Sequence, residues 1–249
     1  MTANRTSNRL LSALSDEDYE LIKDRLEEVD MPHGLQLAKA GEPFGYAFFP
    51  STGIASVIAV SATGRRAEAG MAGHEGFAPI AGLLHPGRGP FDIVVQVAGH
   101  GLRLPLSTLH DAMDRSRDLT DLLLRYVLAF HFQVAYTAFS NASHTIDIRL
   151  ARWILMSQDR MQNNELALTH DYISLMLAVR RPSVTIALHT LEGERLIRSE
   201  RANVIVRDRK GLETFAGDAY GVPEREYCRL IDQERQPSAT MLTALETPA

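Results

Sequence analysis

The spacing of hydrophobic residues divides the chain into regions of different texture. Between Met31 and about Pro105, short apolar runs are interrupted by glycine and proline, as in FDIVVQVAGHGLRLP. Short runs with turn residues between them predict the strands of a small β-barrel or jelly roll. The glycine-rich segment 70–84 leaves room for a short helix. Before this region, a short amphipathic helix is predicted over residues 10–30, with Ser15 as its N-cap and an apolar face of Leu11, Leu14, Leu21, Leu26 and Val29.

A long helical pattern follows from Ser107 to about Ala142. Its apolar residues recur at steps of three and four, and further apolar positions widen the stripe. Such a helix has to bury more than one face. We expect one face on the barrel and another on a partner subunit, although burial within one subunit fits the pattern as well. Arg125, His131 and Gln133 interrupt its most apolar stretch, which indicates a buried helix and not a membrane span.

The C-terminal third predicts three short helices followed by a two-stranded hairpin, the outline of a winged helix. Two of the helices lie in LTHDYISLMLAVRRPSVTIALHTLEGERLI. Thr169 is a good N-cap for the first, and Pro182 suits the first turn of the second, at about 182–192. The second helix has an apolar stripe of Val184, Leu188 and Leu191 and an outer face of Arg181, Ser183, Thr185 and His189. This arrangement favours a helix-turn-helix, although an ordinary helical hairpin has the same spacing.

The charge distribution helps to choose between these alternatives. The net charge is −5, which alone does not indicate a nucleic-acid-binding protein. Residues 149–210, however, hold eleven Lys/Arg against seven Asp/Glu, whereas residues 211–249 hold three against seven. The positive block coincides with the predicted helix-turn-helix, and the hairpin after it carries Arg198, Arg201 and Arg207. Contacts to phosphates need such a block, so the hairpin is interpreted as a wing on DNA.

Composition argues against several other classes of protein. The single cysteine, Cys228, cannot form an internal disulfide or hold an iron–sulfur cluster, and its role is left open between a bystander and a redox-sensitive thiol. The histidines show no metal-ligand pair on one helix face. No P-loop, dinucleotide fingerprint or nucleophile elbow is present, so no enzyme is expected. The first residues lack the apolar core of a secretory signal, so a cytoplasmic protein is expected.

These segments, in this order, resemble the Crp/Fnr family of regulators. LAKAGEPFGYAFFPSTGIASVI resembles the opening strands of the family's cyclic-nucleotide-binding-like barrel, and GMAGHEGF and VVQVAG resemble one subgroup of it. NASHTIDIRLARWILMSQDR resembles the junction between dimer helix and DNA-binding domain, and DRKGLE follows the wing as it often does there. The resemblance covers nearly the whole chain. It implies an α+β fold with a β-barrel sensor domain (1–115), a dimerisation helix and hinge (116–146), a winged helix-turn-helix (147–220) and an acidic tail (221–249).

The resemblance also implies which residues meet DNA. The family's base-reading positions fall on Arg181, Pro182 and Ile186, and usual phosphate contacts fall on His170 and Ser183. Pro182 and Ile186 replace side chains that are polar in the best-known members, so the target sequence cannot be borrowed from them. The turn position usually held by glycine is Ala178, which costs roughly 1 kcal/mol if it needs a positive φ. The complete DNA-binding set is expected to be His170, Arg180, Arg181, Pro182, Ser183, Thr185, Ile186, His189 and Arg201.

For the barrel, the resemblance leaves the ligand open. Members that bind cyclic AMP use a Gly-Glu pair for the ribose and an arginine for the phosphate, where this chain has Pro79-Ile80 and Pro90. A buried phosphate without its arginine is poorly compensated, so no cyclic AMP site is expected, although Arg88 could substitute in part. Haem on His74 or His85 is an open alternative, and no metal site is expected. The candidate pocket residues are Glu75, which lines a pocket or caps a short helix, Gly76 and Arg88.

The sequence therefore predicts a sequence-specific transcriptional regulator. It is expected to bind a pseudo-palindromic double-stranded DNA site as a homodimer, with RNA polymerase as a further candidate partner and no membrane association. The alternative is a sensor module for a cyclic nucleotide or haem whose C-terminal domain contacts a protein.

Overall fold

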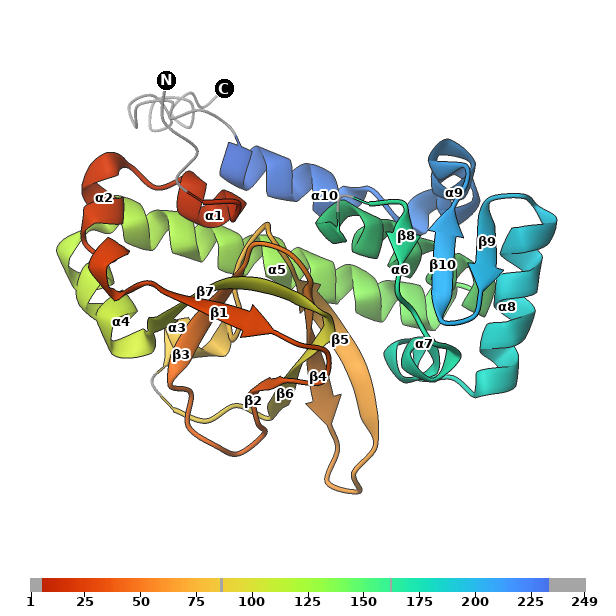
Figure 1. Ribbon diagram of the computed structural model, residues 1–249, viewed down its shortest axis with the longest axis horizontal. Coiled ribbons are helices and arrows are strands. Elements are labelled where there is room, and N and C mark those ends of the chain that lie inside the picture. The colour runs from red at the N-terminus through yellow and green to blue at the C-terminus, as the bar shows by residue number, and fades with distance from the viewer. Residues whose placement is uncertain (1–5, 86, 162, 233–249) are drawn as a thin grey trace, which may run out of the picture.

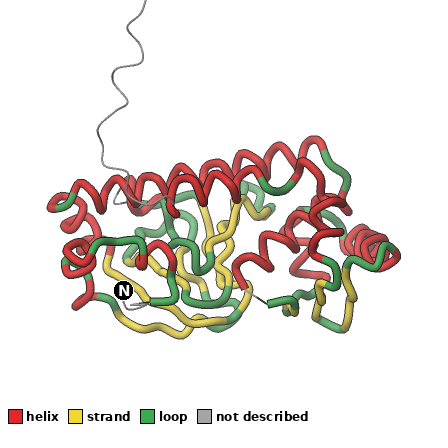
Figure 2. Tube along the Cα trace, turned by 90° about the horizontal axis from the view of Figure 1, so that it is seen from above, coloured by secondary structure: helices red, strands yellow, loops and turns green. Residues whose placement is uncertain are grey.

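The computed structural model describes residues 6–85, 87–161 and 163–232. A β-barrel packs under one half of a long helix, α5 (Arg117–Ser143), and a helical C-terminal unit lies at the far end of that helix (Figure 1). From above, most strands gather on one side of the chain and the C-terminal helices with their small hairpin on the other (Figure 2). This arrangement confirms the predicted α+β fold of barrel, long helix and winged helix-turn-helix.

The barrel consists of two antiparallel sheets, with strand orders β1-β7-β3 and β2-β6-β4-β5. Phe49 and Leu104 are fully buried in one cluster with Phe77 and with Tyr126 of α5, so the barrel packs directly on the long helix. The predicted short helix of segment 70–84 is α3 (Ala81–Leu84). The strands are β1 (Glu27–Met31), β2 (Gln36–Ala38), β3 (Tyr46–Pro50), β4 (Ile54–Val60), β5 (Arg66–Ala72), β6 (Phe91–Val97) and β7 (Gly99–Pro105).

The prediction of one amphipathic helix over residues 10–30 is wrong. This segment contains α1 (Arg9–Ser12), α2 (Asp16–Glu20) and the 3-10 turn η1 (Lys23–Arg25), and it ends in strand β1. Ser15 does act as an N-cap, because its side chain accepts a hydrogen bond from Asp18 N at 3.0 Å and starts α2 afresh. The last residues pair with β7, so cross-strand hydrogen bonds outweigh the local helical spacing there.

The helical pattern from Ser107 resolves into two helices, α4 (Leu106–Arg115) and α5. Ser116 separates them and caps α5, because its Oγ accepts a hydrogen bond from Leu119 N at 3.1 Å. Among the described residues, α5 is a helix that could cross a membrane by length and composition. Its Gln133 is buried and bridges to β5, accepting from Met71 N at 2.7 Å and donating to Met71 O at 3.1 Å. One face of α5 is therefore fixed to the barrel.

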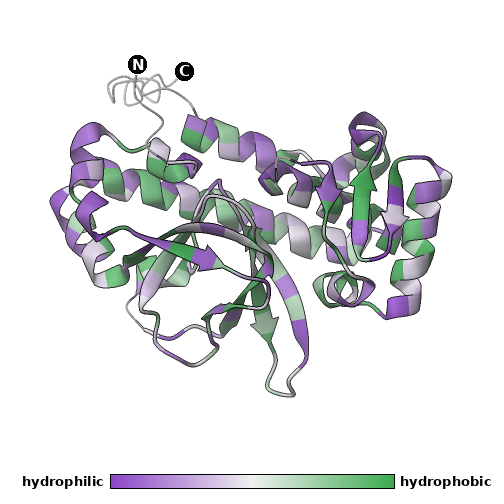
Figure 3. Cartoon of the chain, in the orientation of Figure 1, coloured by the Kyte–Doolittle hydropathy of each residue, from purple (hydrophilic) through white to green (hydrophobic). Residues whose placement is uncertain are grey.

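The C-terminal unit consists of helices α6, α7, α8 and α9 and a small sheet of order β8-β10-β9. Strand β10 is largely hydrophobic (green in Figure 3), and its Val204 and Val206 are buried in the core of the unit. The same core contains Ile58 of β4 and Met71 of β5, so the barrel and the C-terminal unit share one hydrophobic cluster. The elements are α6 (Ile146–Met161), β8 (Glu165–Leu166), α7 (His170–Leu177), α8 (Arg181–Gly193), β9 (Ile197–Glu200), β10 (Asn203–Val206), α9 (Arg209–Ala216) and the 3-10 turn η2 (Gly217–Ala219).

After the C-terminal unit, the chain returns along α5 towards the N-terminus (Figure 1). This C-terminal segment is formed by α10 (Val222–Tyr227) and the π-type turn η3 (Cys228–Asp232). Leu230 and Ile231 are buried in the cluster of the barrel and α5, and Arg125 Nη1 donates to Leu230 O at 3.2 Å. The sequence predicted only an acidic tail over 221–249. Its described part is packed helix, and residues 233–249 lie outside the described residues.

Candidate nucleic-acid interface

Helices α7 and α8 are joined by a tight turn whose geometry depends on one alanine. Thr169 caps α7, since its Oγ1 accepts a hydrogen bond from Tyr172 N at 3.2 Å. Ala178 ends α7 in the left-handed region with φ of 52°, and its N–H reaches Leu175 O at 3.2 Å. Glycine adopts this backbone more easily than alanine. Ala178 therefore does adopt a positive φ, the condition under which alanine costs roughly 1 kcal/mol relative to glycine.

The buried stripe of α8 is the predicted one. Val184, Leu188 and Leu191 are at most 1% exposed and belong to the core of the C-terminal unit, together with Ala187. Arg180 precedes the helix in an extended conformation, and Pro182 lies in the first turn, where its missing N–H leaves no hydrogen bond unmade. The spacing of the stripe fixes which way α8 faces, because burying these side chains turns the opposite face outward.

That opposite face is open, and α8 lies at the end of the molecule farthest from the barrel (Figure 1). Ile186 is 68% exposed, and the Arg181 side chain is 64% exposed. Ser183 and Thr185 are half-buried, whereas Arg180, Pro182 and His189 are exposed. A helix with both an exposed aliphatic side chain and an exposed arginine is suited to a partner that offers both apolar and acceptor groups.

The open face carries weak contacts of its own. Arg181 Nη1 lies 3.2 Å from Asp171 Oδ1 of α7, and both side chains are mostly exposed. An exposed ion pair of this kind contributes about 0–1 kcal/mol, so a phosphate or a base can compete for the guanidinium. His170 Nδ1 lies 3.3 Å from Thr185 Oγ1, which connects the start of α7 to α8. The sequence did not indicate that Asp171 would pair with Arg181.

The predicted hairpin is formed by β9 and β10. Their register pairs Glu200 with Asn203, so Arg201 and Ala202 form the turn, and Ala202 has φ of 59°. Arg201 is exposed at this turn. Arg198 Nε lies 2.9 Å from Glu200 Oε1 on the same strand. The hairpin thus presents one free-standing arginine at its tip, on the same unit as α8.

A second exposed surface runs along α5. The exposed residues that form this surface are spaced alternately four and three residues apart, which is the heptad spacing of a coiled coil. Phe139 lies next to this stripe and is 45% exposed. The sequence predicted steps of three and four along this helix and a face for a partner subunit, but not which residues form that face. We call these residues the α5 stripe: Leu124, Leu128, His131, Ala135, Ala138 and Ala142, all exposed.

The candidate pocket residues are not brought together. Glu75 is buried and lines a cavity, and its Oε2 accepts a hydrogen bond from Gly73 N at 2.9 Å. It therefore lines a pocket and does not cap a helix. Gly76 lies against the Tyr126 ring, where an added Cβ would come within 1.9 Å of Cζ. Arg88 is exposed, in a loop that bridges to Pro43 in the barrel, and does not line the cavity of Glu75.

A second cavity, of about 260 Å³, lies between the barrel and α5 and contains Pro79 and Ile80. The rest of its lining is apolar apart from His131. Pro90 is exposed, and no arginine of the described residues lines this cavity. Of the two candidate haem ligands, His85 is exposed and His74 is buried with Nδ1 3.1 Å from Arg160 O. No cluster of three or more His, Cys, Asp or Glu suited to a metal ion occurs in the described part of the chain.

Comparison with known proteins identifies the C-terminal unit. A family model described as the Crp-like helix-turn-helix domain matches residues 148–215. No curated protein matches the chain.

Solved structures match most of the chain at low identity. A Crp/Fnr-family transcriptional regulator from Eubacterium rectale has a TM-score of 0.63 and 18% identity, covering 84% of this chain and 98% of its own. FixK2 from Bradyrhizobium japonicum has a TM-score of 0.67 and 16% identity, with 77% and 98% covered. The c-di-GMP-responsive regulator CLP of Xanthomonas campestris has a TM-score of 0.61 and 15% identity, with 77% and 99% covered. At these identities the likeness shows a shared fold.

Proposed function

Because residues 148–215 are a Crp-like helix-turn-helix domain within the fold of the Crp/Fnr regulators, we propose that this chain regulates transcription as a homodimer bound to a pseudo-palindromic DNA site. The observation that carries the proposal is the open outer face of α8, with Arg181 and Ile186 both more than 60% exposed. In a winged helix-turn-helix, this second helix enters the major groove with its N-terminal residues nearest the bases.

The proposal divides the chain by task. Residues 1–115 form a sensor barrel, 116–146 a dimerisation helix and hinge, and 147–220 the DNA-binding domain. Residues 221–249 follow as the C-terminal extension, whose described part packs on α5. The protein acts in the cytoplasm without catalysis, and RNA polymerase is a further candidate partner. No cyclic AMP site is assigned to the barrel, because the cavity with Pro79 and Ile80 has an almost entirely apolar lining and, among the described residues, no arginine that could pair with the phosphate.

Base reading is assigned to the first turns of α8. Arg181 can donate two hydrogen bonds to O6 and N7 of a guanine. Ile186 and Pro182 present apolar surface, which suits the methyl group of thymine. This pairing explains how a recognition helix can function with few polar side chains at these positions. We therefore expect half-sites in which guanine and thymine neighbour each other.

Positioning on the phosphates is assigned to the residues around this reading face. His170 and Ser183 lie at the start of α7 and α8, where backbone N–H groups also favour anions. Arg180 and Arg201 add positive charge at the turn and at the wing tip. Thr185 and His189 complete the set along α8. These contacts carry no sequence information, but they make binding fall steeply with salt.

The homodimer is assigned to the α5 stripe. Six exposed positions at 4-3 spacing, five of them apolar, form the seam that two helices bury against each other. Ala135 and Ala138 allow the two backbones to approach closely in the C-terminal half. The two copies of α8 would then face DNA half-sites about one helical turn, or roughly 34 Å, apart.

The DNA-binding proposal is tested with Arg181→Ala. The wild-type site is first selected from random duplexes, and affinities for this site and for an unrelated duplex are measured by fluorescence anisotropy. Loss of a bidentate guanine contact weakens specific binding by about 1–3 kcal/mol, whereas non-specific binding changes little. Arg117→Ala, which removes an exposed arginine at the start of α5, is the matched control and leaves both affinities unchanged. Equal losses of affinity for both duplexes would show that Arg181 does not read bases. If no site can be selected from the random duplexes, the DNA-binding proposal is wrong.

The dimer is tested with Leu124→Glu combined with Leu128→Glu. Placing four carboxylates on the seam of two helices converts the dimer to monomer, as measured by light scattering after gel filtration. Arg115→Glu, at the exposed end of α4 and outside the stripe, stays dimeric. If the double variant keeps the mass of a dimer, the dimer interface does not lie on the α5 stripe.

A further inference from the structure

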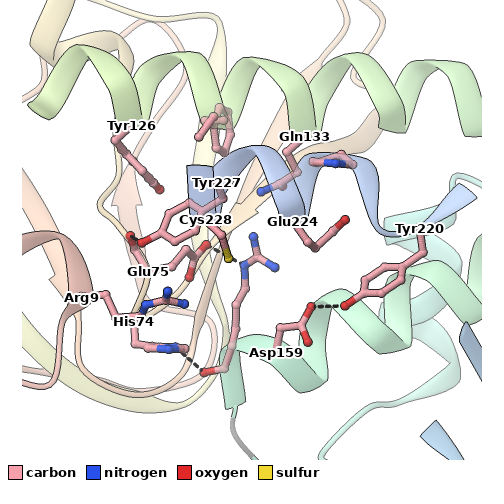
Figure 4. Close-up of a pocket in the computed structure, with 14 residues that line it drawn as sticks. Arg9, His74, Glu75, Tyr126, Gln133, Asp159, Tyr220, Glu224, Tyr227 and Cys228 are labelled. Atoms are coloured by element: carbon pink, nitrogen blue, oxygen red, sulfur yellow. Dashed lines mark hydrogen bonds and ion pairs between the residues drawn. The ribbon is translucent and has the colours of Figure 1, made fainter. Parts of the chain in front are cut away.

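The cavity lined by Glu75 lies where Arg9 of α1 and four other parts of the chain meet, and it has a volume of about 470 Å³. His74 and Glu75 come from the turn after β5, Tyr126 and Gln133 from α5, and Asp159 from α6. The fourth side is the C-terminal segment with Glu224, Tyr227 and Cys228 (Figure 4). A volume of this size lies within the range of small-molecule sites. The cavity is separate from the cavity that holds Pro79 and Ile80.

Aromatic rings supply much of the wall. Three tyrosines line the cavity, and each hydroxyl is already hydrogen-bonded. Tyr126 donates to Phe77 O at 3.3 Å, Tyr227 donates to Glu75 O at 2.7 Å, and Tyr220 donates to Asp159 Oδ2 at 2.7 Å. Phe130 and Pro223 add further flat apolar surface. Because the hydroxyls are held by the protein, the rings themselves are left to contact a ligand, and flat rings favour a planar partner.

The two arginines of the wall are paired with carboxylates of the protein. Arg160 Nε lies 2.8 Å from Glu75 Oε1, and both side chains are about nine-tenths buried. Burial opposes the charge of Arg160, but the carboxylates of Glu75 and Asp159 outweigh it and raise its pKa. Arg9 Nη2 lies 2.5 Å from Asp232 Oδ2. An anionic ligand would therefore meet no unpaired arginine among the described lining residues and would lose its hydration without compensation.

Polar groups for orienting a neutral ligand are nonetheless present. Glu224 uses Oε2 to accept a hydrogen bond from Gly221 N at 2.9 Å, and Arg160 uses Nη1 to donate to Met156 O at 2.8 Å. Each side chain has a further atom, Glu224 Oε1 or Arg160 Nη2, that can serve as acceptor or donor. Glu224 and Arg160 line the same cavity, so one molecule can contact both.

We propose that this junction cavity binds an uncharged, planar ring compound that carries both a hydrogen-bond donor and an acceptor, and that its binding stabilises the contact between barrel and DNA-binding domain. The ring lies among Tyr126, Phe130 and Tyr227, and its polar edge faces Arg160 and Glu224. The second half of the inference rests on the proposed function. A ligand held by the barrel, α5, α6 and the C-terminal segment at once favours the arrangement that brings them together.

Cys228, the single cysteine of the chain, lines the cavity and provides the test. Its thiolate attacks a fragment disulfide, forms a mixed disulfide and releases the fragment thiol, and an attraction between fragment and cavity makes the product harder to reduce. Burial and the neighbouring Asp232 raise the pKa of the Cys228 thiol, so the exchange is run near pH 8.5. The probe is the disulfide of N-(2-mercaptoethyl)nicotinamide. The cyclohexanecarboxamide analogue controls for planarity, and the terephthalamic acid analogue controls for charge.

Intact-mass spectrometry gives the 2-mercaptoethanol concentration at which half of each product is reduced. We expect the nicotinamide product to require about tenfold more reductant than either analogue, which corresponds to about 1.4 kcal/mol. The preference disappears in the double variant Cys228→Ser, Arg229→Cys, which moves the thiol to the neighbouring exposed position. The proposed site is wrong if the three mixed disulfides are equally resistant to reduction, or if a cysteine at position 229 shows the same preference for nicotinamide.

Regulation is read from DNA affinity in the same samples. Protein carrying nicotinamide at Cys228 should differ at least fivefold in DNA Kd from protein carrying the cyclohexane analogue. Selective trapping with unchanged DNA affinity overturns the coupling to DNA binding. Loss of DNA binding in every sample, including untreated protein, instead overturns the proposed function, so the two failures can be distinguished.

Discussion

Two buried carboxylates join the barrel to the DNA-binding domain, and they differ in what they meet. Glu68 on β5 and Glu75 in the turn after it are seven residues apart, and both contact α6 at positions seven residues apart. Glu68 Oε1 accepts a hydrogen bond from Trp153 Nε1 at 2.8 Å, whereas Glu75 pairs with the Arg160 guanidinium. We call these two contacts between the barrel and α6 the joints. Both use a glutamate, which has a neutral partner in the Glu68 joint and a cationic partner in the Glu75 joint.

The difference decides the ionisation of Glu68. Burial raises the pKa of Glu68 from 4.5 to about 7, and hydrogen bonds from Ser56 and Trp153 offset only part of that effect. Both donors are neutral, so neither compensates a buried charge in the way that Arg160 does for Glu75. The contact of Glu75 with α6 therefore depends on an intact ion pair, whereas the stability contributed by the contact of Glu68 with α6 depends on pH.

Removing the carboxylate of the charged joint should have the largest effect. Glu75→Ala leaves the Arg160 guanidinium buried without its nearest partner, which costs about 3–5 kcal/mol of unfolding free energy. Urea denaturation followed by tryptophan fluorescence of Trp153 measures it. The control is Glu42→Ala, which breaks the exposed pair with Lys39 and should have a far smaller effect. Similar losses for the two variants would mean that the Glu75 joint is no stronger than a surface pair.

The neutral joint should respond to pH. The folded protein binds a proton at Glu68 more tightly than the unfolded chain, so this group contributes full stability below about pH 4.5 and loses it as the pH rises to about 7. The loss is roughly 3 kcal/mol by pH 8. Glu68→Gln keeps an acceptor for Trp153 and cannot ionise. We expect it to be more stable than wild type at pH 8 and nearly equal at pH 4, in urea titrations. A difference that does not depend on pH would contradict the assignment.

The helix-turn-helix could be predicted from the sequence because its determinants are local. The buried stripe of α8 follows from residues three and four positions apart, and Ala178 lies where the turn requires a left-handed residue. Thr169 and Pro182 act within one turn of their own positions. Local hydrogen bonds and the helical period therefore determine which residues face outward, and a single sequence contains both.

The joints could not be predicted, because their partners are distant in the chain. Trp153 lies 85 residues after Glu68, and Arg125 and Leu230 are 105 residues apart. Nothing in the spacing around position 221 indicates that the extension turns back along α5. The prediction of one helix over residues 10–30 was wrong for the same reason, since β1 is held by its pairing with β7. Long-range contacts of this kind override local preference and leave no periodic signal.

The smallest expected effect is on unfolding free energy, and it comes from removing one of the two hydroxyls near Glu68, those of Ser56 and Tyr172. Ser56 Oγ donates a hydrogen bond to Glu68 Oε2, so Ser56→Ala should cost about 1 kcal/mol at pH 4, where Glu68 is protonated. At pH 8 the acceptor is a carboxylate, and the cost should rise to about 2 kcal/mol. Tyr172→Phe is the control, because its hydroxyl lies 3.4 Å from Ser56 Oγ, too far for a strong hydrogen bond. It should cost less than about 0.5 kcal/mol at either pH. If urea titrations give Ser56→Ala the same cost at both values, Glu68 does not change its charge between them, and the contrast with Glu75 is lost.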